Sequence, residues 1–174
     1  MRYLVGIDLA MYKTGMSILD LEYESSRFVL FTTHIKIASR KSSDIEMRLI
    51  RYSKDKNYVK WGIELGTNIV NYLFTNNITD LGFCFEGKAY TSFKTGNFDE
   101  FTGAVKAILF KTFPSSPIYI TPINTIKKFA TGNGRASKQD MISAFIKDNN
   151  IDPVVDDIAD AYYIAKYIQC RGGH

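Results

Sequence analysis

Three consecutive segments of strand character open the chain, and their order limits the possible folds more than any other feature. Residues 3–8 (YLVGID) are apolar up to a final Asp, a second apolar segment begins at Gly15, and residues 27–37 are rich in β-branched and aromatic side chains. Segments so close along the chain connect most simply as an antiparallel meander. The sequence therefore predicts a sheet that begins with three antiparallel strands.

The rest of the chain alternates between helical and strand patterns. Apolar residues recur at three- and four-residue steps from Val59 to Leu73, which predicts a long amphipathic helix. Further elements are expected in the order strand, helix, strand and three helices, over residues 78–86, 98–111, 118–120, 125–130, 138–147 and 157–170. Such alternation favours parallel pairing. The predicted fold class is α/β, with a mixed five-stranded sheet flanked by helices.

Length and composition indicate one globular unit. We expect a single domain over residues 1–170 and a C-terminal tail over residues 171–174. Apolar residues make up 45% and charged residues 23%, which argues against a disordered or fibrous protein. No apolar run approaches the roughly 20 residues of a membrane span, and no signal-peptide pattern begins the chain. A cytoplasmic protein without a membrane partner is expected.

Two minor features complete this outline. The polar, charged stretch between residues 39 and 56 is interpreted as a surface loop. Cys84 and Cys170 lie in apolar segments, so both are expected to be buried free thiols.

Four acidic residues interrupt otherwise apolar segments. Asp8 ends the first predicted strand, Glu86 ends the fourth, and Asp157 and Asp160 lie in the last predicted helix. A carboxylate at the end of a buried strand loses hydration unless a cation or donor compensates. Neighbouring strand ends share one edge of a sheet, and a spacing of three places both helical acids on one face. The four side chains can therefore converge.

A cluster of four carboxylates has a definite chemistry. The charges repel one another and raise their pKa values unless cations neutralise them. Oxygen ligands without His or thiolate favour Mg²⁺ or Mn²⁺ over zinc, and two such ions about 3.5–4 Å apart can direct water onto a phosphodiester. The pattern predicts metal-dependent phosphodiester hydrolysis. Taken singly, however, each acid could simply end a strand or interact with a helix dipole.

The motifs GIDLA, FCFEG, TGNGRASKQDM and DDIADAYYIA, in this order, resemble those of the RuvC-type Holliday-junction resolvases, which have the RNase H-like (retroviral integrase) fold. The similarity covers nearly the whole chain. It implies a catalytic and metal-ligating tetrad of Asp8, Glu86, Asp157 and Asp160 with two Mg²⁺ ions, for which Mn²⁺ may substitute. It also implies a homodimer that nicks four-way DNA junctions symmetrically and acts on other branched DNA such as forks, leaving 5′-phosphate and 3′-hydroxyl ends.

Two short segments depart from the family pattern. Leu9 and Ala10 replace the Pro-Gly that usually follows the first Asp, and Gly87, Lys88 and Ala89 replace a glutamine and an aromatic residue after the Glu. These departures put the bacterial cleavage-sequence preference in doubt. They are compatible with a phage or other viral branch, in which case the expected location is the host cytoplasm.

Two segments combine cations with features typical of DNA contacts. The net charge of +4 is compatible with a polyanionic partner. After Glu86, an aromatic side chain could stack on an unpaired base, or instead pack on the next helix; the residues concerned are Lys88, Tyr90, Phe93 and Lys94. Cations around the TGNG loop could bind phosphate with the backbone amides, or simply form a solvated face; these are Lys127, Lys128, Arg135 and Lys138.

Two other functions fit part of the sequence. A non-catalytic junction-binding module of the same fold would bind branched DNA by shape. Clustered negative charge next to the DNA would, however, weaken DNA binding by such a protein. GIDLAMYKTG also resembles the first phosphate loop of sugar kinases and actin-like ATPases. Those proteins need two such domains, and 174 residues supply one.

Overall fold

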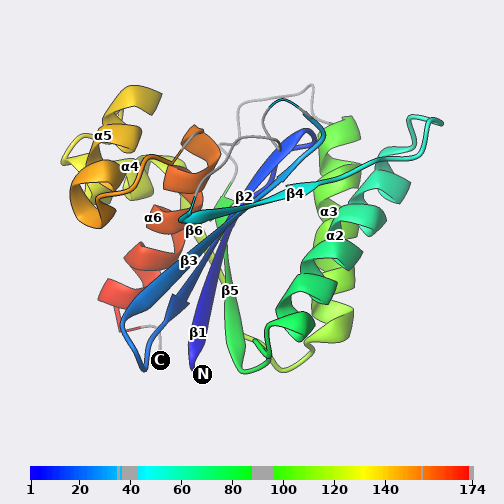
Figure 1. Ribbon diagram of the computed structural model, residues 1–174, viewed down its shortest axis with the longest axis horizontal. Helices are drawn as coiled ribbons and strands as arrows, with labels where there is room; N and C mark the ends of the chain where they lie inside the picture. Colours follow the sequence, from blue (N-terminus) through cyan, green and yellow to red (C-terminus); the bar gives the residue numbers. More distant parts are fainter. Residues whose placement is uncertain (35, 37–42, 88–95, 154, 173–174) are drawn as a thin grey trace.

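A six-stranded mixed sheet lies at the centre of the computed structural model, with helices on both faces (Figure 1). The structure describes residues 1–34, 36, 43–87, 96–153 and 155–172. The strand order across the sheet is β4-β3-β2-β1-β5-β6. The strands are β1 (Tyr3–Asp8), β2 (Lys13–Asp20), β3 (Ser25–Thr32), β4 (Ile45–Leu49), β5 (Leu81–Gly87) and β6 (Ile118–Pro122).

The pairing follows the predicted pattern. β1, β2 and β3 form an antiparallel meander, whereas β5 pairs parallel to β1 and β6 pairs parallel to β5. The predicted α/β class is therefore confirmed.

The strand β4 lies in the segment predicted to be a surface loop, so that prediction is wrong for residues 45–49. β4 pairs parallel to β3 at the edge of the sheet. Ile45, Met47 and Leu49 alternate with Glu46 and Arg48, which is a strand pattern, but charged residues on both sides hide it. Exposed charges on an edge strand also hinder pairing with another molecule.

The helices form two layers, one on each face of the sheet (Figure 1). One layer holds α2 (Tyr58–Thr75) and α3 (Gly96–Thr112), and the other holds α4 (Ile123–Thr131), α5 (Lys138–Asn149) and α6 (Asp156–Cys170). The N-cap of α5 is Ser137, which forms a capping box with Asp140. In the described part of the chain, no helix is long and apolar enough to cross a membrane.

Each face of the sheet has its own apolar core. Val5, Ile7 and Phe85 belong to the core under α2 and α3, whereas Leu4 and Cys84 belong to the core under α6. Cys84 is buried as expected, but the expectation for Cys170 is wrong: this free cysteine is exposed because it is the last residue of α6.

Two glycines bring α6 unusually close to the sheet. A Cβ atom added to Gly6 of β1 would lie 2.1 Å from the Ala161 carbonyl oxygen, and one added to Gly15 of β2 would lie 2.0 Å from the Asp157 carbonyl oxygen. The backbone of α6 therefore packs directly on two strands. Gly15 pairs with Asp8 across the β1–β2 ladder, so the first turn of α6 lies beside the end of β1.

Candidate active site

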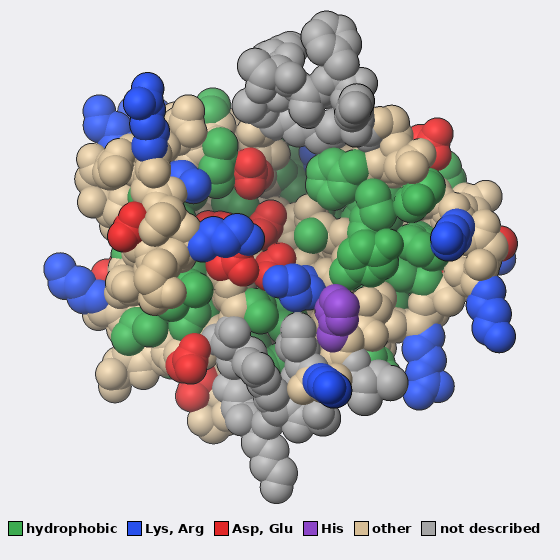
Figure 2. Space-filling model, turned by 90° about the horizontal axis from the view of Figure 1, so that it is seen from above, with side chains coloured by type: hydrophobic (Ala, Val, Ile, Leu, Met, Phe, Trp, Pro, Cys, Tyr) green, Lys and Arg blue, Asp and Glu red, His purple; other side chains and the backbone are tan. Residues whose placement is uncertain are grey.

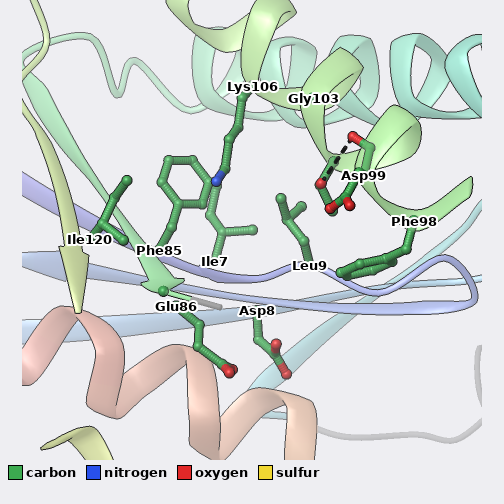
Figure 3. Close-up of a pocket in the computed structure, with 12 residues that line it drawn as sticks. Ile7, Asp8, Leu9, Phe85, Glu86, Phe98, Asp99, Gly103, Lys106 and Ile120 are labelled. Atoms are coloured by element: carbon green, nitrogen blue, oxygen red, sulfur yellow. Dashed lines mark hydrogen bonds between the residues drawn. The ribbon is translucent and has the colours of Figure 1, made fainter. Parts of the chain in front are cut away.

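Strand geometry places Asp8 and Glu86 on the same face of the sheet. Successive side chains of a strand point to opposite faces. Leu4 and Cys84 face α6, so Asp8 and Glu86, an even number of residues further along β1 and β5, face it too. Ile7 pairs with Phe85, which makes Asp8 and Glu86 neighbours one step beyond. Figure 3 shows both carboxylates on the α6 side of their strands.

The first turns of α6 supply the other two acids. Asp157 is buried, with 7% of its surface exposed, and Asp160 is half-buried one turn later. The contact at Gly15 holds this end of the helix against β2. The structure thus brings together all four acids of the predicted tetrad, although their catalytic and metal-binding roles stay a prediction.

Burial and mutual repulsion perturb these carboxylates. Burial raises the pKa of Asp8 well above its usual range, and the charges of Asp160, Asp157 and Glu86 raise it further. Burial, followed by the charges of Asp156 and Glu86, raises the pKa of Asp160 to about 7. Burial also raises the pKa of Glu86 and of Asp157. Ionising the whole cluster is therefore costly without added cations.

The donor set suits a hard divalent cation. All four side chains offer carboxylate oxygens, and the Oδ1 atom of Asp160 is buried without a hydrogen-bond partner in the described residues. Within the described ranges, no three Asp, Glu, His or Cys side chains form a ready-made metal cage. An ion would therefore have to draw the carboxylates closer together than they are here.

Two lysines already neutralise part of the cluster. The Nζ atom of Lys13 lies 3.1 Å from Oδ2 of Asp157 and 4.0 Å from Oδ1 of Asp156. Lys138 forms an ion pair with Asp156. Burial opposes ionisation of Asp156, but the hydrogen bond and charge of Lys138 prevail and hold its pKa below the usual range.

Sequence reasoning missed Lys13 and Asp156 as parts of the site. Lys13 lies at the start of β2, five residues after Asp8, and its contact with α6 forms only through the tertiary fold. Asp156 directly precedes Asp157 in the sequence, and both lysines lie close to it.

The predicted DNA-contact residues have different surroundings. Lys127 donates a hydrogen bond to the Ala136 carbonyl oxygen (2.7 Å), and its charge partly offsets the raised pKa values of Glu86 and Asp160. Lys128 and Arg135 are exposed, and Lys138 is ion-paired as described above. The other four predicted contacts lie outside the described residues; they are Lys88, Tyr90, Phe93 and Lys94.

The acidic cluster lies where β1 ends and reaches the surface only in part: Asp8, Glu86 and Asp160 are half-buried, and Asp157 is buried. Figure 2 shows acidic side chains gathered near the centre of this face, with basic side chains around them and a field of hydrophobic side chains beside them. On the opposite side of β1 and β5, a cavity of about 530 Å³ lies under α3. Figure 3 shows Lys106 and Phe85 on the cavity side, whereas Asp8 and Glu86 point away from it.

Lys13→Met is expected to lower the free energy of unfolding in EDTA at pH 8 by about 1 kcal/mol, because it leaves the buried Asp157 carboxylate without its cation. Urea denaturation measures this loss. Lys147→Met, which removes an exposed lysine from α5, is the matched control and should change stability little. Adding Mn²⁺ should reduce the difference in unfolding free energy between Lys13→Met and the wild type. Equal stability of the two variants in EDTA would contradict a neutralising role for Lys13.

Comparison with known proteins gives matches among solved structures only. No family model and no curated protein matches the sequence. The structure of Thermus thermophilus RuvC matches with a TM-score of 0.65 and 15% identity, over 98% of this chain and 96% of that chain. T. thermophilus RuvC in complex with Holliday junction substrate matches with a TM-score of 0.64 and 15% identity, over 99% of this chain and 97% of that chain. The yeast mitochondrial Holliday junction resolvase Ydc2 matches with a TM-score of 0.53 and 15% identity, over 93% of this chain and 75% of that chain. The RNase H-like fold of the RuvC type is therefore confirmed.

Proposed function

We propose that this chain, which has the RuvC-type fold, is a Mg²⁺-dependent endonuclease that resolves four-way DNA junctions and other branched DNA. The observation that carries the proposal is the convergence of four carboxylates from β1, β5 and α6 at one edge of the sheet. In a protein that only bound DNA, this negative charge would lower the affinity for DNA. The products of the proposed endonuclease are 5′-phosphate and 3′-hydroxyl ends.

The four acids share one proposed role, which is to hold the metal ions. Asp8, Glu86, Asp157 and Asp160 would hold two Mg²⁺ ions, or Mn²⁺ in their place. When bound, such ions activate water and stabilise the leaving oxygen of a phosphodiester. Asp8 is central because Asp160, Asp157 and Glu86 all act on its pKa.

The neighbouring cations position the DNA. Lys127 lies close enough to Glu86 and Asp160 to shift their pKa values, so it can contact the phosphate that is cut. The exposed side chains of Lys128 and Arg135 lie on α4 and the loop after it, where they can bind flanking phosphates with a salt-sensitive contribution.

A homodimer suits the proposed substrate. A four-way junction has two equivalent strands to cut, which matches the symmetry of a two-fold dimer. T. thermophilus RuvC, which matches over nearly the full length of both chains, has been solved with a Holliday junction substrate. We propose the same substrate class here, with paired cuts made by two copies of this chain.

The direct test is cleavage of synthetic four-way, three-way and linear DNA with Mg²⁺. We expect cutting of branched DNA in preference to linear DNA. Glu86→Gln should reduce the rate by about 100-fold or more, because a carboxylate that would hold the metal is lost. The matched control is Glu24→Gln, which changes an exposed residue in the turn between β2 and β3 and should cut at the wild-type rate.

The same experiment separates the proposal from a non-catalytic junction binder. Both would bind four-way junctions in EDTA, but only the nuclease gives product when Mg²⁺ or Mn²⁺ is added. Junction binding by the wild type without any product in either metal would contradict the nuclease assignment.

A further inference from the structure

A cluster of aromatic side chains lies beside the proposed active site. We call it the aromatic platform; its members are Tyr12, His34, Tyr52, Tyr58 and Trp61. The ring of Trp61 stacks on Tyr52, with centroids 4.9 Å apart and an interplanar angle of 10°. Tyr58 meets Trp61 edge to face at 5.5 Å, and Tyr12 does so at 6.4 Å. His34 lies 6.5 Å from Tyr12.

Hydrogen bonds hold the platform in place. The indole Nε1 of Trp61 donates to the Ser53 carbonyl oxygen at 2.8 Å, and the Tyr12 carbonyl oxygen accepts from the Thr33 N–H at 3.0 Å. Nevertheless, 53% of the Tyr12 surface is exposed. A ring that is anchored by its backbone and open to solvent loses little conformational freedom when a flat ligand stacks on it.

The platform borders the acidic cluster through one residue. Tyr12 lies in the turn between β1, which ends at Asp8, and β2, which begins at Lys13. Lys13 is the residue whose ammonium lies 3.1 Å from the Asp157 carboxylate. Figure 2 shows hydrophobic side chains beside the acidic side chains on this face. A polymer bound across the acids would therefore reach Tyr12 with its next units.

The segment that carries two of the platform rings has a net positive charge. The segment from Arg51 to Lys60, which carries Tyr52 and Tyr58, contains four cations and one acid, Asp55. The carboxylate of Asp55 is paired with Lys60 at 3.2 Å. Arg51, Lys54 and Lys56 are exposed and form no ion pair among the described residues. One further acid lies at the platform: the Glu64 carboxylate accepts a hydrogen bond from the Ser53 N–H at 3.2 Å. Aromatic rings interleaved with cations are typical of single-strand binding surfaces.

We propose that the aromatic platform stacks an unpaired nucleobase of the DNA strand that crosses the acidic cluster, with Tyr12 as the contacting ring. This inference rests on the proposed function for the identity of the ligand. The phosphodiester at the acids would then be flanked by a nucleotide that has left the duplex stack. Tyr12 would thereby favour branch points, where unpaired bases occur, over regular duplex.

Trp61 is the only tryptophan of the chain and provides a built-in reporter. In EDTA, an oligothymidylate of twelve nucleotides should quench Trp61 fluorescence, whereas a blunt duplex of twelve base pairs should quench it much less. Tyr12→Ala should weaken binding of the oligothymidylate by roughly tenfold and reduce the quenching, in line with the usual contribution of one base–aromatic stack. Tyr12→Phe should behave like the wild type, because the ring is kept.

Two further variants make the result specific. Tyr12→Leu keeps an apolar contact with Trp61 but has no aromatic ring, so it should bind as weakly as Tyr12→Ala. Tyr23→Ala removes an exposed tyrosine (67% exposed) from the turn between β2 and β3, and should bind like the wild type. Equal affinities for Tyr12→Ala and Tyr23→Ala, or equal quenching by duplex and oligothymidylate, would overturn the platform.

Failure of the platform and failure of the nuclease proposal give different results. If the wild type binds oligothymidylate through Tyr12 but cuts no DNA with Mg²⁺ or Mn²⁺, the platform stands and the nuclease proposal fails. If the wild type cuts junctions, and Tyr12→Ala binds oligothymidylate and cuts junctions as well as the wild type does, the nuclease proposal stands and the platform fails.

Discussion

Asp8→Asn is expected to abolish DNA cleavage and, at the same time, to make the metal-free protein more stable at pH 8. The loss of activity, about 10³-fold or more, follows from removing the carboxylate that lies among the other three acids, since metal-dependent charge stabilisation contributes several kcal/mol. The gain in stability has a separate cause. Asp8 is half-buried, and both desolvation and the charges of Asp160, Asp157 and Glu86 oppose its ionisation, whereas the neutral amide of Asn carries no such cost.

The stability gain should depend on pH in a defined direction. The pKa of Asp8 is raised in the folded state, so the folded protein holds its proton at pH values where the unfolded chain has lost it. Stability is therefore fully present below the ordinary Asp pKa of about 4 and declines as pH rises through the folded-state value. Asp160, with a pKa of about 7, follows the same direction. Asp8→Asn should thus exceed wild-type stability at pH 8 and lose this advantage near pH 4.

Thermal unfolding in EDTA between pH 4 and pH 8 measures the stability effect, and junction cleavage with Mg²⁺ measures the activity. Glu24→Gln serves again as the control, because it removes one exposed negative charge far from the cluster. Junction binding by Asp8→Asn should persist in EDTA. A variant that cuts at the wild-type rate would refute the tetrad, and one that is destabilised at pH 8 would show that Asp8 is not under repulsion.

The acids were predictable from the sequence because each marks a change in hydrophobic pattern. Asp8 and Glu86 each follow an apolar strand, and the parity of the strand fixes which face they share. Asp157 and Asp160 stand three apart at the start of an apolar helix, so their common face follows from helix geometry. What the sequence could not show is how closely α6 approaches the sheet, because that distance depends on Gly6 and Gly15 together.

Contacts made only by the tertiary fold escaped prediction. Nothing in the local sequence distinguishes Lys13 from the other lysines, and its contact with Asp157 forms only because β2 packs against α6. Tyr12 contacts Trp61, which is forty-nine positions later in the chain, and no local pattern connects the two. The edge strand β4 was hidden for another reason: it is short and charged, and only one of its two edges is paired.

Gly15→Ala is expected to have the second large effect, by pushing α6 away from the sheet. The added Cβ would lie 2.0 Å from the Asp157 carbonyl oxygen, and the neighbouring atoms there belong to backbone rather than to a flexible side chain. Relief requires the helix to move by about 1 Å. We expect a loss of about 3 kcal/mol in unfolding free energy, as in severe overpacking. Cleavage should fall by about 100-fold, because Asp157 and Asp160 move with the helix.

Gly103→Ala is the matched control for this substitution. Gly103 lies inside α3, and a Cβ added there meets nothing within 4 Å. Because alanine is favoured over glycine in a helix, this variant should be more stable by roughly 0.5–1 kcal/mol. Urea denaturation and junction cleavage of both variants separate the two effects. If Gly15→Ala were as stable and as active as the wild type, α6 would not be held on β2 in the way that places Asp157 and Asp160 beside Asp8, and the proposed site would lose its geometric basis.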